Sequence, residues 1–80
     1  MQIKLLLFGI VKDIVGKNTT ELEIIPNTTI TDFKSILIEQ YPKLVPYKNF
    51  SVAVNENYVD DTYLIKANDV IAIIPPVSGG

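Results

Sequence analysis

The sequence predicts an α+β domain in which one main helix covers one face of a mixed β-sheet. Several short segments are rich in apolar residues, as strands are, whereas one segment combines helical spacing with clear start and stop signals. The chain has 80 residues, of which 48% are hydrophobic. It is therefore long enough for one domain and apolar enough for a dense core.

The N-terminal part predicts two strands and a short helix. Residues 2–8 form a run rich in Leu and Ile, which Gly9 ends, and this run predicts the first strand. Residues 10–15 fit a short amphipathic helix that stops at Gly16. Residues 19–25 alternate apolar and polar side chains, which predicts a second strand that pairs with the first.

The main helix is predicted over residues 29–41. Thr29 and Asp32 occupy the positions of a capping box, with Asp32 in place of the usual Glu, and apolar residues then recur at helical spacing. Pro42 ends the helix because proline disfavours helical backbone at the residue before it. Residues 42–49 are expected to form an irregular connection.

The C-terminal half predicts the rest of the sheet. Residues 51–55 predict a short third strand, residues 58–59 a fourth, and residues 69–74 a strongly apolar last strand. We therefore expect a sheet of four to five strands with one main helix and one short helix.

The composition excludes several classes of function. Cysteine and histidine are both absent from the sequence, so the thiol nucleophile, the usual general base and the commonest metal ligand are missing. Seven lysines, no arginine and a net charge of −2 leave no basic stripe for nucleic acid. The apolar stretches are too short to span a membrane, and the N-terminus has no signal-peptide pattern. We expect neither a nucleic acid partner nor a membrane.

No metal site is expected. Asp60, Asp61 and Asp69 carry oxygen ligands, but no spaced ligand set accompanies them. Carboxylates in a turn are most often solvated, and we expect these three to be solvated as well.

Residues 75–80 are predicted to form an extended tail beyond a domain of residues 1–74. Pro75 and Pro76 cannot donate a hydrogen bond to a sheet ladder, and they favour a stiff, extended backbone. They therefore end the last strand and direct the tail away from the domain. Four extended residues reach at most about 14 Å, which is enough to enter the buried site of a partner.

The tail continues with Val77, Ser78, Gly79 and Gly80. The two glycines lack a Cβ atom and would pass the narrowest part of a channel. A terminal carboxylate on Gly80 is a poor electrophile until an ATP-using partner adenylates it, after which sulfur or an amine can attack the acyl carbon. Such a carrier needs no catalytic side chains of its own. The alternative is a frayed terminus with no chemical role.

The first and last strands carry apolar side chains on both faces, but one main helix covers only one face. The other face must be shielded by the chain's own loops or by a partner. Phe8, Tyr58 and Ile74, beside the tail, are the candidates for the exposed remainder and for a partner interface.

Two parts of the sequence resemble a known family. The C-terminal part comprises VNENYV at residues 54–59, then Leu64, then DVIAIIPPVSGG at residues 69–80. The N-terminal part is LLFG at residues 6–9, followed by the pairs Lys12-Asp13 and Val15-Gly16. Together they resemble the small, sulfur-carrying subunits of molybdopterin synthase over nearly the whole chain.

The resemblance implies a ubiquitin-like β-grasp fold and a role in molybdenum cofactor biosynthesis. It implies that a ubiquitin-activating-type enzyme adenylates Gly80 with ATP and magnesium, and that a sulfur donor then converts the acyl-adenylate to a thiocarboxylate. The tail would enter the large subunit of molybdopterin synthase, which supplies the catalytic side chains and binds cyclic pyranopterin monophosphate.

By the same resemblance, sulfur is transferred twice to build the dithiolene of molybdopterin, in a tetramer of two small and two large subunits. The chain itself would bind no cofactor and would be cytoplasmic.

Three other functions fit the same fold and tail. The chain could carry sulfur for thiamine or another product, or it could be a ubiquitin-like modifier whose Gly80 forms an isopeptide bond with a lysine. It could also be a plain interaction domain. The segment Pro75 to Ser78 favours molybdopterin.

Overall fold

The computed structural model describes residues 1–75 of the chain. Its elements are β1 (Gln2–Leu7), α1 (Gly9–Val15), β2 (Thr19–Glu23), α2 (Ile30–Gln40), the 3-10 helix η1 (Pro42–Tyr47), β3 (Ser51–Val54), β4 (Asn57–Tyr58) and β5 (Val70–Ile74). The predicted tail residues Pro76, Val77, Ser78, Gly79 and Gly80 lie outside the described residues. In residues 1–75, none of the helices has the length and apolar character needed to cross a membrane.

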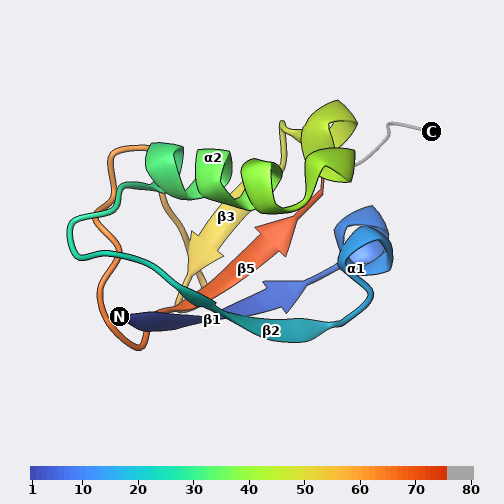
Figure 1. The fold of residues 1–80 in the computed structure, drawn as a ribbon. Coiled ribbons are helices and arrows are strands. Elements are labelled where there is room, and N and C mark those ends of the chain that lie inside the picture. The colour runs from blue at the N-terminus through green and yellow to red at the C-terminus, as the bar shows by residue number, and fades with distance from the viewer. Residues whose placement is uncertain (76–80) are drawn as a thin grey trace.

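The strands form one five-stranded sheet in the order β2-β1-β5-β3-β4. The central strands β1 and β5 are parallel, and every other neighbouring pair is antiparallel. Helix α2 crosses one face of the sheet, and α1 lies beside the ends of β1 and β5 (Figure 1). The predicted α+β architecture, with a mixed sheet, one main helix and one short helix, is confirmed.

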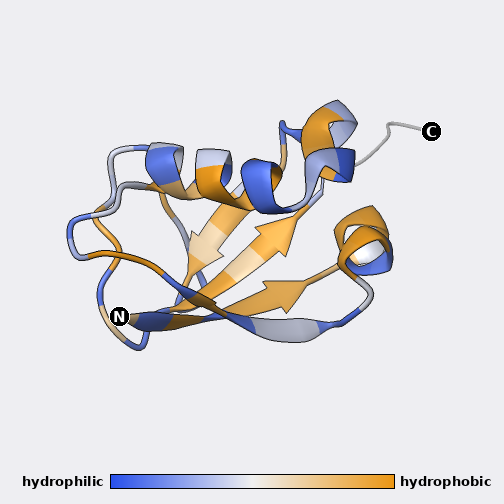
Figure 2. Ribbon diagram, in the orientation of Figure 1, coloured by the Kyte–Doolittle hydropathy of each residue, from blue (hydrophilic) through white to orange (hydrophobic). Residues whose placement is uncertain are grey.

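The core lies between α2 and one face of the sheet. On β1, the alternate residues Ile3, Leu5 and Leu7 are almost completely buried, and α2 contributes Phe33 and Leu37 from its inner side. Figure 2 shows this division along α2, whose apolar side faces the strands while its polar side faces solvent. Helical spacing on one element and alternation on the other therefore meet in a single core.

The main helix begins where its capping residues predict. The hydroxyl oxygen of Thr29 accepts a hydrogen bond from the backbone N–H of Asp32 at 3.2 Å. The helix itself runs from Ile30 to Gln40, so the predicted range of 29–41 includes the residue that caps each end. The short helix α1 ends at Val15 and is capped by Gly16, whose φ of 86° is left-handed and whose N–H donates a hydrogen bond to the carbonyl of Lys12.

The expectation of an irregular connection over residues 42–49 is wrong, because Pro42–Tyr47 forms η1. Proline suits the first turn of a helix, where its missing N–H would have no partner. Leu44 is fully buried and draws this turn onto the core. The burial of Leu44 thus stabilises a helical turn in a segment whose prolines had suggested an irregular connection.

Several strand boundaries also differ from the prediction. β1 ends at Leu7, because Phe8 is the N-cap of α1. β2 ends at Glu23, before the predicted Ile25. β4 starts one residue early, at Asn57, which pairs with Val54. Asp69 precedes the last strand and does not belong to it.

Asp69 is only 6% exposed, so the expectation that it is solvated is wrong. Its carboxylate accepts hydrogen bonds from the Asn55 amide at 3.0 Å, the Tyr63 hydroxyl at 3.1 Å and the Lys66 backbone N–H at 2.9 Å. The Asn55 side chain also accepts a bond from the N–H of Val70. These bonds hold the β3–β4 hairpin against the start of β5.

Asp60 and Asp61 lie at the surface, as predicted. Asp61 is exposed and forms an ion pair with Lys34 at 3.1 Å. Asp60 is also exposed, and hydrogen bonds from the hydroxyl and the N–H of Thr62 lower the pKa of its carboxyl. The pKa of the Tyr63 phenol is raised by partial burial and by its bond to Asp69. In residues 1–75 no group of three or more acidic side chains is placed to hold a metal ion.

We expect Asp69→Ala to lower the free energy of unfolding by about 2 kcal/mol, because each buried donor left without a partner costs about 1–3 kcal/mol. Urea denaturation followed by circular dichroism measures the loss. Asp61→Ala is the matched control, since it removes an exposed ion pair worth less than about 1 kcal/mol. Equal losses for both variants would show that the Asp69 network does not stabilise the fold.

Candidate functional site

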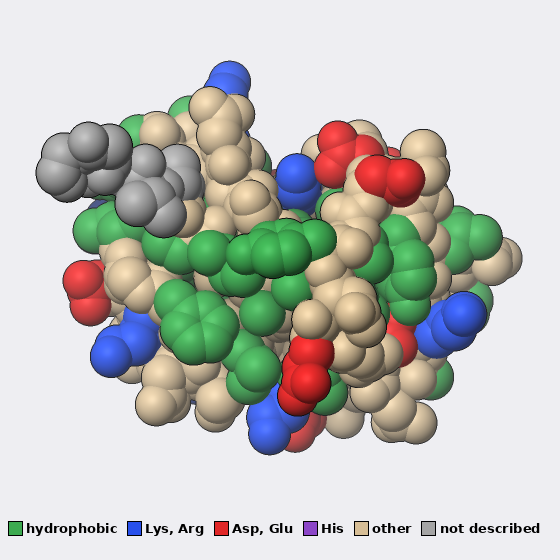
Figure 3. Space-filling model, turned by 180° about the vertical axis from the view of Figure 1, so that it is seen from behind, with side chains coloured by type: hydrophobic (Ala, Val, Ile, Leu, Met, Phe, Trp, Pro, Cys, Tyr) green, Lys and Arg blue, Asp and Glu red, His purple; other side chains and the backbone are tan. Residues whose placement is uncertain are grey.

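The face of the sheet opposite α2 carries an apolar groove of about 580 Å³. Seen from behind, hydrophobic side chains gather across the middle of the molecule, with charged side chains around them (Figure 3). The groove is lined by residues of β1, β3, β4 and β5, by the N-cap of α1 and by the turn between β3 and β4: Leu6, Phe8, Ala53, Asn55, Glu56, Tyr58, Val70, Ala72 and Ile74. We call this set the apolar groove.

The floor of the apolar groove follows from the strand register. Leu6 pairs with Ala72, Ala72 with Ala53, and Ala53 with Tyr58, so these four residues form one row across four strands. Side chains that are paired in this way point to the same face of a sheet. Because the two central members are alanines and the two outer members are large, the surface is hollow in the middle of the row.

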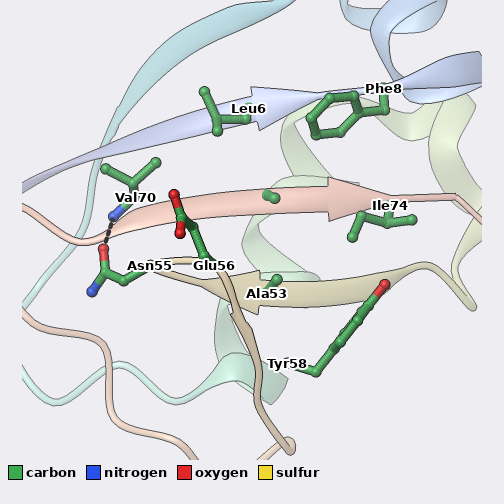
Figure 4. A pocket seen from close by; sticks show the side chains of 9 residues that line it. Leu6, Phe8, Ala53, Asn55, Glu56, Tyr58, Val70 and Ile74 are labelled. Atoms are coloured by element: carbon green, nitrogen blue, oxygen red, sulfur yellow. Dashed lines mark hydrogen bonds between the residues drawn. The ribbon is translucent and has the colours of Figure 1, made fainter.

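The rim of the apolar groove holds all three predicted interface residues. Phe8 is 49% exposed and Tyr58 is 72% exposed, whereas Ile74 is half-buried. Figure 4 shows the three side chains toward the same end of the strands, with Ile74 between Phe8 and Tyr58. The structure therefore brings the three residues onto one apolar surface. Their contact with a partner stays a prediction.

The predictions missed the floor of the apolar groove and its polar end. Asn55 was expected within a strand, but Asn55 and Glu56 form the turn of the β3–β4 hairpin, with φ of 50° and 74°. An asparagine between two short apolar runs is a hairpin signal, because Asn tolerates left-handed backbone. The pairing of Ala53 with Ala72, in contrast, joins residues far apart in the sequence and leaves no local signal.

The tail leaves the sheet at one end of the apolar groove. Pro75 directly follows Ile74, the last residue of β5 and a lining residue of the groove. Of the predicted tail residues, Pro75 alone is described, and it is half-buried. Any partner that receives the tail can therefore also contact the rim.

The apolar groove offers a binding surface, and its side chains offer little chemistry. Glu56 is the one ionisable carboxylate among its lining residues, and Asn55 is already bonded to Asp69 and Val70. A hollow lined mainly by apolar side chains on an open sheet face is typical of a protein interaction site.

A comparison with protein families identifies the family of the chain, because the model of the ThiS family matches residues 5–80. The chain belongs to the ThiS family. The match covers every strand of the sheet, at least in part, and continues through the tail to Gly80.

Relatives of this ThiS-family chain include a molybdopterin synthase sulfur carrier subunit from Dictyostelium discoideum. It is 42% identical over 99% of this chain and 96% of its own length. Among solved structures, the small archaeal modifier protein 1 of Methanosarcina acetivorans is 26% identical, with a TM-score of 0.76 over 99% of this chain and 96% of that one.

A third match is a chain from the complex of subunits 1 and 2 of the molybdopterin-converting factor of Helicobacter pylori. It is 22% identical, with a TM-score of 0.70 over the whole of both chains, and this likeness shows the fold alone. The ubiquitin-like β-grasp fold implied by the sequence resemblance is confirmed by these neighbours.

We expect Tyr58→Thr to change the unfolding free energy of this ThiS-family chain by less than about 0.5 kcal/mol, because exposed surface positions contribute little to stability. Ile25→Thr, at a position that is 74% exposed and lies outside the groove, is the matched control. Phe33→Ala, in the core, should cost about 3–5 kcal/mol. A large loss for Tyr58→Thr alone would mean that the rim supports the fold.

Proposed function

We propose that this chain is the sulfur carrier subunit of molybdopterin synthase. The observation that carries the proposal is its similarity, over 99% of its length, to a relative with that name, together with a family match that continues to Gly80. The apolar groove beside the tail supports it, because a carrier must present its tail to at least two partners and needs a surface by which they hold it.

The proposed chemistry takes place at the carboxylate of Gly80. An oxygen of this carboxylate attacks the α-phosphorus of ATP in the activating enzyme, and pyrophosphate leaves. Sulfide from a donor then attacks the acyl carbon and AMP leaves, so that a thiocarboxylate remains on Gly80. Magnesium and ATP belong to the activating enzyme, and the chain binds neither alone. The resemblance to the family places the reaction in the cytoplasm.

In the second half of the proposed cycle, the tail of residues 75–80 enters the large subunit of molybdopterin synthase. The thiocarboxylate sulfur forms a bond to a carbon of cyclic pyranopterin monophosphate, and water then cleaves the acyl C–S bond and returns Gly80 to a carboxylate. Two such transfers build the dithiolene. The catalytic side chains belong to the large subunit, in agreement with the absence of histidine and cysteine from this chain. Phe8, Tyr58 and Ile74 form the contact that seats the carrier on its partner, in a heterotetramer of two small and two large subunits.

A ubiquitin-like modifier is the second candidate. It is favoured by the similarity to the small archaeal modifier protein 1 of Methanosarcina acetivorans. Activation is the same in both functions, and the acceptor differs: a lysine amine attacks the acyl carbon in place of sulfur. Gly80 found in isopeptide bonds with other proteins in cell extracts would support this candidate.

We expect the chain to gain about 16 Da when it is incubated with its activating enzyme, ATP, magnesium and inorganic sulfide, because sulfur replaces one oxygen at Gly80. Intact mass spectrometry measures the gain. A chain without Gly79 and Gly80 should show no gain yet unfold at the same urea concentration, because a tail buries little surface. Sulfur incorporation into the shortened chain would sink the proposal.

We expect Tyr58→Thr to weaken binding to the large subunit by at least about fivefold, because a buried interface Tyr contributes more than about 1 kcal/mol. Calorimetric titration measures the dissociation constant. Ile25→Thr, equally exposed but away from the apolar groove, should bind as the wild type does. If both variants bind normally, the large subunit does not use this groove.

A further inference from the structure

We propose that Gly9 is a positioning residue for the tail, because its missing side chain provides the space in which the Pro75 ring sits. This inference rests on the proposed function, since it concerns the direction in which the tail is presented to a partner. It assigns a role to a residue that lies outside both the core and the apolar groove.

The register of the two central strands brings the two residues together. β1 and β5 are parallel, and their last pair is Leu7 with Ile73. Two positions further along the chain, just beyond the strands, stand Gly9 and Pro75. They lie side by side at the end of the sheet where β1 and β5 both finish. There the strands separate: Gly9 turns into α1 with a φ of 55°, and Pro75 has no N–H with which to continue the ladder.

The contact between these two residues is tighter than a Cβ atom on Gly9 would normally make. A Cβ atom placed there would lie 3.0 Å from Cγ of Pro75 and 3.9 Å from its Cδ. Carbon atoms normally approach to about 3.5–4.0 Å, so the proline ring would have to move. The ring has to yield by a few tenths of an ångström. Because it is closed on its own backbone nitrogen, it yields by changing its pucker or by turning the main chain with it.

A small displacement at Pro75 has a large effect on the reacting carbon. When residues 76–80 are extended in a partner's site, as proposed, their end is about 17 Å away, and a tilt of about 10° at the base moves it by about 3 Å. An error of about 1 Å in the position of a reacting group can lower a rate about a hundredfold. The space at Gly9 therefore matters more for the reaction than for the fold.

Gly16 provides the matched control. It also has left-handed backbone, with a φ of 86°, but a Cβ atom there would meet nothing within 4 Å. Gly9→Ala and Gly16→Ala therefore both introduce backbone strain, and only Gly9→Ala disturbs the proline. A difference between their reaction rates isolates the contact from the strain.

The experiment measures the rate of thiocarboxylate formation with the activating enzyme, ATP, magnesium and inorganic sulfide, at several concentrations of the full chain. We expect Gly9→Ala to lower kcat at least about tenfold with little change in KM, because the groove is intact and the tail is misplaced. Gly16→Ala should remain within about twofold of the wild type, since the strain it introduces lies away from the tail.

The Pro75→Ala background tests the contact itself. Removing the ring removes the clash, so Gly9→Ala should have no further effect on kcat in that background, and the double variant should react faster than Gly9→Ala alone. If Gly9→Ala does not fold, Pro75→Ala tests the same contact from the other side. It should lower kcat about threefold, because its tail has lost the ring that Gly9 seats.

The outcomes separate this inference from the proposed function. Equal rates for Gly9→Ala and Gly16→Ala, or additive effects of Gly9→Ala and Pro75→Ala, would overturn the positioning role while the sulfur carrier function stands. A wild-type chain that gains no sulfur would overturn both. A wild-type rate for Pro75→Ala would show that the proline ring does not set the course of the tail.

Discussion

The parallel pairing of β1 with β5 is the constraint on which the rest of the structure depends. It joins the first strand of the chain to the last at the centre of the sheet, so that the core and the apolar groove are built on its two faces. Parallel strands also end at the same edge of a sheet. For this reason Gly9, at the start of α1, and Pro75, at the start of the tail, are neighbours in space, although they are 66 positions apart in the sequence.

The two faces of the sheet differ in the size of their apolar residues, and this difference separates a packed core from a binding surface. On the covered face, branched side chains such as Leu5, Ile71 and Val52 fill the space under α2 and are almost completely buried. On the open face, Ala53 and Ala72 occupy the centre of a row whose ends are large. Both faces are apolar. The large residues under the helix make a core, and the small residues on the open face make a hollow that another protein can fill.

Local signals predicted the elements well, and non-local contacts account for what they missed. The capping hydroxyl of Thr29, the spacing of the apolar residues after it and the stop before Pro42 are all contained in one stretch of chain. The burial of Leu44 in η1 and of Asp69 beneath the hairpin depends on partners that only the folded sheet provides. In the candidate site, the rim residues could be predicted by asking which apolar side chains lie on the sheet face that the main helix does not cover. The floor formed by Ala53 and Ala72 depends on how the strands are paired, which the local sequence does not show.

A β-sheet can associate with copies of itself by strand addition, and the two edge strands of this sheet limit that association. β4, at one edge, has only two residues and offers a short row of free backbone groups. β2, at the other edge, directs the charged side chains of Glu21 and Glu23 to solvent. Short and charged edges discourage strand addition between chains. Strand addition between copies is therefore disfavoured at both edges, by shortness at β4 and by charge at β2, and the hollow face is the surface of the sheet that is shaped to receive another protein.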